Sequence, residues 1–293
     1  MSWRTIVIGT RAKLDLQLGY MVVRGERTTK VHISEISTLI VESTEVSLTC
    51  ALLAELVANK IKVIFCDVKR NPCSELLPYY GSHDVSAKIK QQIAWDDKIK
   101  GDIGTAIIFN KIIMQSCLLK KLGLANAEIL DLYAHQLEYR DATNREGHAA
   151  KVYFNSIFGE SFTRTEDTFI NSALNYGYSI LLSACNREIV TNGYLTQIGL
   201  IHDNIFNSFN LGSDIMEPLR PFVDLVVYRM FVEKGLEEFV TEQKHELLSF
   251  LNMDVQVDEK KYVLNYAVKL YCKSVFDAIN GNDISLVKWC KFI

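Results

Sequence analysis

One short stretch, Tyr80-Gly-Ser-His-Asp84, separates two different hydrophobic patterns in this chain of 293 residues. Before it, apolar and polar residues alternate, as in Leu14-Asp-Leu-Gln-Leu18, which is typical of a strand with one buried face. After it, from about Val85 onward, apolar residues recur at helical spacing almost without interruption. We therefore expect an α+β protein, with a small β-rich N-terminal domain at residues 1–82 and a larger all-α domain at residues 83–293.

The same patterns predict the individual elements on each side of this stretch. In the first part, further strands are predicted at residues 5–8, 30–33, 37–41 and 62–66, with one helix at residues 46–60. In the second part, helices are predicted at residues 85–99, 101–121, 125–139, 143–158, 164–184, 217–233, 236–251 and 259–279. Neither internal repeats nor low-complexity segments interrupt this order.

Composition excludes several classes of protein. With 48% hydrophobic residues and a net charge of −3, the chain is too apolar and too weakly charged to be disordered. No uncharged apolar run approaches the roughly 18 residues that span a bilayer, and the N-terminus lacks the pattern of a signal peptide. The 7 cysteines form no C-x-x-C pair, which favours a reduced, cytoplasmic chain over a disulfide framework or a zinc site.

Charge is unevenly distributed along the chain. The first 90 residues hold 12 Lys and Arg against 9 Asp and Glu, whereas the remainder holds 20 against 26. Proteins that bind nucleic acid usually carry a basic excess. Any contact with phosphate must therefore come from local basic patches, and the sequence identifies none of the residues that would form them.

Glu146 is the first candidate for chemistry. On a helical wheel it lies in the apolar stripe of residues 143–158, within about 60° of Ala149, Tyr153 and Ile157. A carboxylate that points into a core is costly unless it is paired or binds a metal. Glu146 is therefore expected either in a buried ion pair or at a metal site, whereas His148 lies on the opposite, polar face.

A second candidate is the run Ser213-Asp-Ile-Met-Glu-Pro-Leu-Arg-Pro221. Asp214 and Glu217 are three residues apart, so their carboxylates share one face of a helix. The same Asp-x-x-Glu spacing, with proline in the first turn, is also the pattern of a helix cap. From the residues alone, a helix cap and an acidic site both remain open.

His202, in Gly199-Leu-Ile-His202, is the third candidate, and three asparagines at spacing three follow it. A lone histidine is more often structural than functional. Together, however, Glu146, His202 and Glu217 would form a carboxylate–imidazole–carboxylate set that suits Mg²⁺ or Mn²⁺. Such an ion can polarise a phosphoryl oxygen and stabilise a departing alkoxide.

These segments resemble those of the CRISPR-associated integrases, the metal-dependent DNA nucleases and integrases that insert new spacers into CRISPR arrays. The similarity is greatest to the version from type II-A systems, and it spans essentially the whole chain. The matching segments include Glu146-Gly-His-Ala-Ala-Lys-Val-Tyr-Phe, Ala173-Leu-Asn-Tyr-Gly-Tyr, Gly199-Leu-Ile-His202 and Asp214-Ile-Met-Glu217-Pro-Leu-Arg220-Pro221.

The resemblance implies roles for particular residues. Glu146, His202 and Glu217 match the family's metal ligands, Asp214 matches an accessory acidic residue, and Arg220 belongs to the same helix-start signature. Many relatives have Asp at the position of Glu217. The implied cofactor is Mg²⁺ or Mn²⁺.

The resemblance also implies partners. These are double-stranded DNA (a donor spacer and a target repeat), a second copy of the chain in a homodimer, and a small ferredoxin-like protein between two such dimers. Other CRISPR adaptation proteins and the RNA-guided nuclease are further candidate partners. No membrane is expected among the partners. The implied reaction is transesterification, in which a donor 3′-hydroxyl attacks a phosphodiester of the repeat.

Two other functions fit the same residues. A metal-dependent nuclease of DNA repair would use the same site with water as the nucleophile. A non-catalytic, dimeric DNA-binding scaffold would use the acidic residues only as caps and ion pairs.

Overall fold

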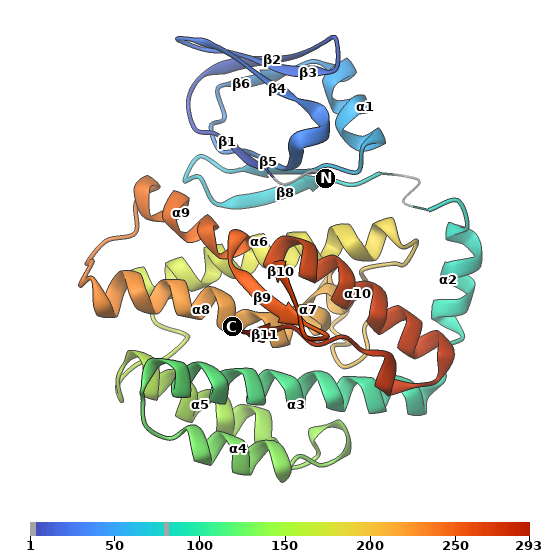
Figure 1. The fold of residues 1–293 in the computed structure, drawn as a ribbon, viewed down its shortest axis with the longest axis vertical. Helices are drawn as coiled ribbons and strands as arrows, with labels where there is room; N and C mark the ends of the chain where they lie inside the picture. The colour runs from blue at the N-terminus through green and yellow to red at the C-terminus, as the bar shows by residue number, and fades with distance from the viewer. Residues whose placement is uncertain (1–3, 79–81) are drawn as a thin grey trace. The chain divides into compact units, whose positions relative to one another are not determined.

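The computed structural model describes residues 4–78 and 82–293, and contacts divide the chain into two compact units, Met1–Val85 and Ser86–Ile293. The boundary expected at residue 82 lies close to this division. Within the predicted linker, Tyr80 and Gly81 lie outside the described residues. Figure 1 shows the strands of the first unit in blue and cyan, and the helices of the second in the later colours.

The first unit contains two four-stranded sheets. One has the order β1-β5-β7-β8, with β8 antiparallel to three parallel strands, and the other has the order β4-β3-β2-β6. The bounds are β1 Arg4–Ile8, β2 Ala12–Gln17, β3 Tyr20–Arg24, β4 Thr28–His32, β5 Ile36–Val41, β6 Val46–Leu48, β7 Lys62–Cys66 and β8 Pro72–Leu76.

A core of apolar residues from these strands and from α1 (Cys50–Ala58) holds the first unit together. Every residue of β5 is buried, as expected of a central strand. The helix predicted at residues 46–60 starts later than expected, because Val46–Leu48 pairs with β2 as a strand. Thr49 then caps the helix, its hydroxyl accepting a hydrogen bond from Leu52 N.

The second unit is mainly helical. Its helices are α2 Val85–Ile93, α3 Asp97–Leu122, α4 Ala127–His135, α5 Arg145–Phe158, α6 Phe169–Thr191, α7 Asn210–Met216, α8 Arg220–Tyr228, α9 Thr241–Leu247 and α10 Leu264–Gly281. Short 3₁₀ or π turns also occur in both units. In the first unit, Ile33–Glu35 lies between β4 and β5. Those of the second unit are Tyr139–Asp141, Glu217–Leu219, Arg229–Glu233, Leu248–Asn252 and Ile284–Leu286.

The longest helix, α3, is the core helix of this unit. It packs against α4, α5 and α8, and its isoleucines at 103, 107 and 112 are fully buried. By length and composition α3 could cross a membrane, but 56% of its most apolar window is buried inside the fold, as in the core helix of a globular unit.

A small sheet departs from the purely helical second domain expected from sequence. Strands β9 (Asp254–Val257) and β10 (Lys260–Val263) form a hairpin, and β11 (Lys291–Phe292) pairs with β9 on its other side. The turn residues Asp258 and Glu259 both have positive φ, as a two-residue hairpin turn requires. The predicted helix at residues 259–279 was therefore wrong in its first turn, and α10 begins at Leu264.

The α+β fold class is confirmed, with a strand-rich N-terminal region and a helical C-terminal part. All 7 cysteines are free.

Candidate active site

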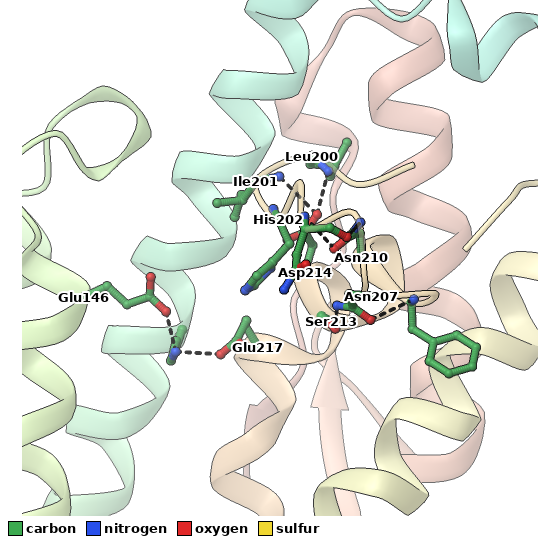
Figure 2. Close-up of polar contacts among 12 residues, drawn as sticks. Glu146, Leu200, Ile201, His202, Asn207, Asn210, Ser213, Asp214 and Glu217 are labelled. Carbon is green, nitrogen blue, oxygen red and sulfur yellow. Dashed lines mark hydrogen bonds and ion pairs between the residues drawn. The ribbon is translucent and has the colours of Figure 1, made fainter. Parts of the chain in front are cut away.

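Two of the predicted ligands, Glu146 and Glu217, meet at a single cation. The Nζ atom of Lys111, on α3, lies 2.5 Å from Glu146 Oε1 and 2.6 Å from Glu217 Oε2. In Figure 2, dashed lines join the carboxylates of Glu146 and Glu217 to this one ammonium group. Glu146 comes from the first turn of α5, and Glu217 opens the 3₁₀ turn between α7 and α8. Three separate elements therefore converge on one charged site.

Glu217 stays ionised in spite of its burial. Burial by itself raises the pKa of this carboxyl, but the nearby Lys111 and Arg220 cations lower it by more, so the net shift is downward. The pKa of Lys111 is raised, because the two carboxylates outweigh the effect of burial on the ammonium group. The site therefore holds its charges in the folded protein.

Arg220 connects this site to a second buried carboxylate. Its Nη2 atom lies 2.7 Å from Glu217 Oε1, and its guanidinium lies 4.7 Å from the ring centroid of Tyr178. The hydroxyl groups of Tyr178 and Tyr153 donate hydrogen bonds to Asp224, at 2.6 and 2.7 Å. Burial raises the pKa of Asp224 to about 6, although both of these hydrogen bonds oppose the shift. The network fixes α5, α6 and α8 behind Glu217.

Asp214 holds the loop that carries His202. Its Oδ2 atom accepts hydrogen bonds from the backbone N–H groups of Leu200 and Ile201, at 2.5 and 3.1 Å. Its Oδ1 atom accepts one from His202 N at 3.0 Å. Asp214 is fully buried inside α7, so the helix-cap interpretation of the Asp-x-x-Glu spacing is wrong for this residue. Its carboxylate instead accepts hydrogen bonds from the backbone of the loop at residues 200–202.

The same carboxylate orients the imidazole of His202. Nδ1 of His202 lies 2.5 Å from Asp214 Oδ1. Nε2 is therefore the ring nitrogen that Asp214 does not contact. This hydrogen bond is the main cause of a raised pKa for His202, and the carboxylates of Glu217 and Glu146 also raise it. Among the described residues, the contacts therefore join Glu146 and Glu217 through Lys111, whereas the imidazole of His202 is held by Asp214.

A glycine allows this loop to approach Asp214 so closely. A Cβ atom on Gly199 would lie 2.4 Å from the carbonyl oxygen of His202 and 2.8 Å from Asp214 Oδ2. Real Cβ atoms do not approach backbone so closely. Close packing against His202 and Asp214 therefore requires glycine as the first residue of the Gly199-Leu-Ile-His202 motif.

Sequence reasoning placed some residues correctly and missed one. His148 is exposed and packs beside the ring of Tyr133, away from the carboxylates, as the helical wheel predicted. Lys111 was not singled out. Its signal was a lysine among isoleucines at helical spacing, with Ile107 and Ile108 one turn before it and Ile112 directly after. A charge at such a core position needs a partner of opposite sign.

The donor set suits a hard divalent cation. Two carboxylates face one cationic position, and Glu217 Oε2 is buried there with an ion-pair contact but no directed hydrogen bond. Carboxylate and imidazole groups with room for water are typical of Mg²⁺ and Mn²⁺ sites. In the residues that the structure describes, Lys111 holds the position between the carboxylates, and no three His, Cys, Asp or Glu side chains lie close enough to hold a metal.

Comparison with known proteins identifies the family of this chain. Residues 6–255 match the model of the family described as CRISPR associated protein Cas1. The CRISPR-associated endonuclease Cas1 of Neisseria meningitidis serogroup C (strain 8013) is 33% identical over 267 residues, which cover 89% of this chain and 87% of that protein.

Solved structures share the fold. A casposase bound to integration product superposes with a TM-score of 0.80 at 17% identity, covering 97% of this chain and 93% of that one. A Cas6-RT-Cas1–Cas2 complex superposes with a TM-score of 0.75 at 16% identity, covering 98% of this chain and 36% of that one. A family model matched over most of the sequence, and a relative similar along nearly all of both chains, show that this chain belongs to the Cas1 family of CRISPR-associated proteins.

Proposed function

We propose that this protein is a divalent-metal-dependent DNA integrase and endonuclease that inserts short foreign DNA duplexes into a CRISPR array. The convergence of Glu146 and Glu217 on one cationic position carries the proposal, and His202, whose imidazole Asp214 orients, is the proposed third ligand. The naming of its relatives as endonucleases and its structural likeness to a casposase bound to integration product support it. The type II-A character expected from the sequence belongs to the same proposal.

The proposed reaction is a transesterification. The 3′-hydroxyl oxygen of the donor forms a bond to a phosphorus atom of the repeat, and the bond from that phosphorus to its 3′-oxygen breaks. The proton of the attacking hydroxyl passes to solvent, and the departing 3′-oxygen takes a proton from solvent to become a new 3′-hydroxyl. No covalent bond to the protein is formed. Mg²⁺ or Mn²⁺, when bound, supplies polarisation of the phosphate and stabilisation of the leaving oxygen.

The residues of this chain would then have distinct roles. Glu146, Glu217 and the Nε2 atom of His202 would hold the ion. Asp214 orients the imidazole through Nδ1, and Arg220 holds one oxygen of Glu217, so that both act as positioning residues. Lys111 keeps the two carboxylates together while no divalent ion neutralises them.

The assembly proposed for this function follows the likeness to a Cas1–Cas2 complex. It consists of a homodimer, a small ferredoxin-like adaptation partner and double-stranded DNA as donor spacer and target repeat. Other adaptation proteins and the RNA-guided nuclease are further candidates, and the proposed location is the cytoplasm.

The test is a strand-transfer assay on branched DNA with and without Mn²⁺. We expect donor 3′-hydroxyl ends to become joined to the target, and replacement of Glu146, His202 or Glu217 by Ala to abolish joining while circular dichroism shows an intact fold. If the ends are only degraded, a repair nuclease is the better description. If no DNA is converted under any metal condition, the scaffold function replaces this proposal.

Metal binding can be measured apart from activity. Mn²⁺ should raise the melting temperature of the protein, because a ligand that binds only the folded state stabilises it. Glu217→Gln should reduce this rise, whereas Glu45→Gln, at an exposed acidic residue of the first unit, should leave it unchanged. An equal rise in both variants would remove Glu217 from the proposed ligands.

A further inference from the structure

The loop between His202 and α7 is held rigid by three asparagines. Asn210 accepts a hydrogen bond from Asn204 N, and its Nδ2 donates to the carbonyl groups of Gln197 and Asn204, at 3.0 and 3.1 Å. Asn207 Nδ2 donates to the hydroxyl of Ser213, beside Asp214. The hydrogen bonds of these three asparagines therefore hold the loop against the start of α7, where Asp214 lies.

At the tip of this loop lies a tight turn. The backbone N–H of Asn207 donates to the carbonyl of Asn204 at 2.9 Å, which makes Ile205 and Phe206 the two central residues. The Asn204 side chain also accepts a hydrogen bond from Phe206 N at 2.9 Å. Polar residues or glycine usually take these central positions, so two large apolar residues there are unusual.

Both tip side chains project into solvent. Ile205 and Phe206 are each 88% exposed, whereas the next most exposed aromatic residue of those the structure describes, Tyr139, is 49% exposed. A rigid turn that presents an aromatic ring has already lost the conformational freedom that a flexible loop would lose on binding. The fold therefore prepares Phe206 for contact with another molecule.

The size and charge of the tip favour a nucleic acid base as that molecule. A single phenylalanine at this exposure offers roughly 130 to 220 Å², far below the roughly 800 Å² that each partner of a stable protein interface buries. Residues 201–210 contain no Lys or Arg, and Asp203 adds a negative charge, so charge attraction to a phosphate is not what this tip offers. An aromatic face stacks on any base without regard to sequence.

The tip also lies close to the proposed reaction. Phe206 follows His202 by four positions in the chain, so their Cα atoms are at most about 14 Å apart. This distance corresponds to about four nucleotides of a stacked strand. We propose that Phe206, supported by Ile205, stacks on one unpaired base of the DNA bound at the Glu146, His202 and Glu217 site. This inference rests on the proposed function, because it takes DNA as the substrate.

The experiment uses branched DNA in which 2-aminopurine replaces single unpaired bases within about four nucleotides of the joining point. The fluorescence of 2-aminopurine is quenched when it stacks on an aromatic ring. The full-length protein should quench it at one or two adjacent positions. Phe206→Ala should lose this quenching and bind the DNA roughly 5- to 150-fold more weakly, as expected for one lost base–aromatic stack. Phe206→Trp should keep both properties.

Leu18→Ala is the matched control, since Leu18 is an exposed apolar residue at a turn of the first unit. Unchanged quenching in Phe206→Ala would overturn the proposal. So would unchanged DNA binding combined with a loss of oligomeric mass, because the tip would then contact protein. Quenching by a wild-type protein that joins no DNA ends would leave the stacking contact standing and refute the integrase. Joining of DNA ends without quenching would support the integrase and refute the stacking contact.

Discussion

Replacing Lys111 with Met should destabilise the folded protein by about 3 kcal/mol. The substitution keeps an unbranched side chain of similar length but removes the charge that lies between Glu146 and Glu217. Removing one partner of a buried ion pair typically costs about 3 to 5 kcal/mol. We take the lower end, because Arg220 still pairs with Glu217 and the side chain of Glu146 is partly exposed.

Thermal unfolding followed by calorimetry in buffer with a chelator measures this cost. For a unit of about 200 residues, 3 kcal/mol corresponds to a decrease in Tm of about 6 to 12 °C. Lys120→Met is the control. Lys120 lies on the same helix and its Nζ is also 2.5 Å from a carboxylate, that of Asp131, but Lys120 is exposed and Asp131 is partly exposed. That pair should contribute less than about 1 kcal/mol.

A double variant tests the reason for the effect. If the uncompensated charge of Glu217 causes the loss, Glu217→Gln should recover part of it in the Lys111→Met background, with a coupling energy of about 1 to 2 kcal/mol. The explanation is wrong if Lys111→Met costs no more than Lys120→Met. It is also wrong if the effects of Lys111→Met and Glu217→Gln simply add.

Three other outcomes are expected. His148→Ala should retain strand-transfer activity within a few-fold, because His148 is exposed and away from the carboxylates; a loss as large as that of His202→Ala in the same assay would contradict this. Asp224 has a folded pKa of about 6, above its ordinary value, so its contribution to stability is present at low pH and is lost as pH rises through 6. The stability of the wild type relative to Asp224→Asn, from urea unfolding, should therefore fall by roughly 1 kcal/mol between pH 5 and pH 7, and no change would mean that Asp224 titrates normally. Binding of donor-length duplexes should weaken steeply with salt and tighten with the ferredoxin-like partner, since a chain with net negative charge has only local basic patches; a titration at several salt concentrations, with and without partner, checks both, and a flat salt dependence would rule out phosphate contacts.

The sequence alone was enough for the two-part architecture and for the buried side of the helix at residues 143–158. Alternation around Leu14-Asp-Leu-Gln-Leu18 and the helical spacing after residue 85 are local signals, although β2 ends at Gln17 and Leu18 lies exposed in the following turn. The wheel of residues 143–158 likewise placed Ala149, Tyr153 and Ile157 in the core and His148 outside. The family motif also drew attention to Glu146, His202 and Glu217, although their role as metal ligands stays a proposal.

Tertiary structure decided what these residues contact. The sequence left a helix cap open for Asp214, but the folded chain brings it under the backbone of residues 200–202. It also brings Lys111 between the two glutamates, and it turns residues 260–263 into a strand that pairs with β9. Each of these contacts joins segments from different elements. Their partners depend on how helices and strands cross in space, which a local pattern of polar and apolar residues does not specify.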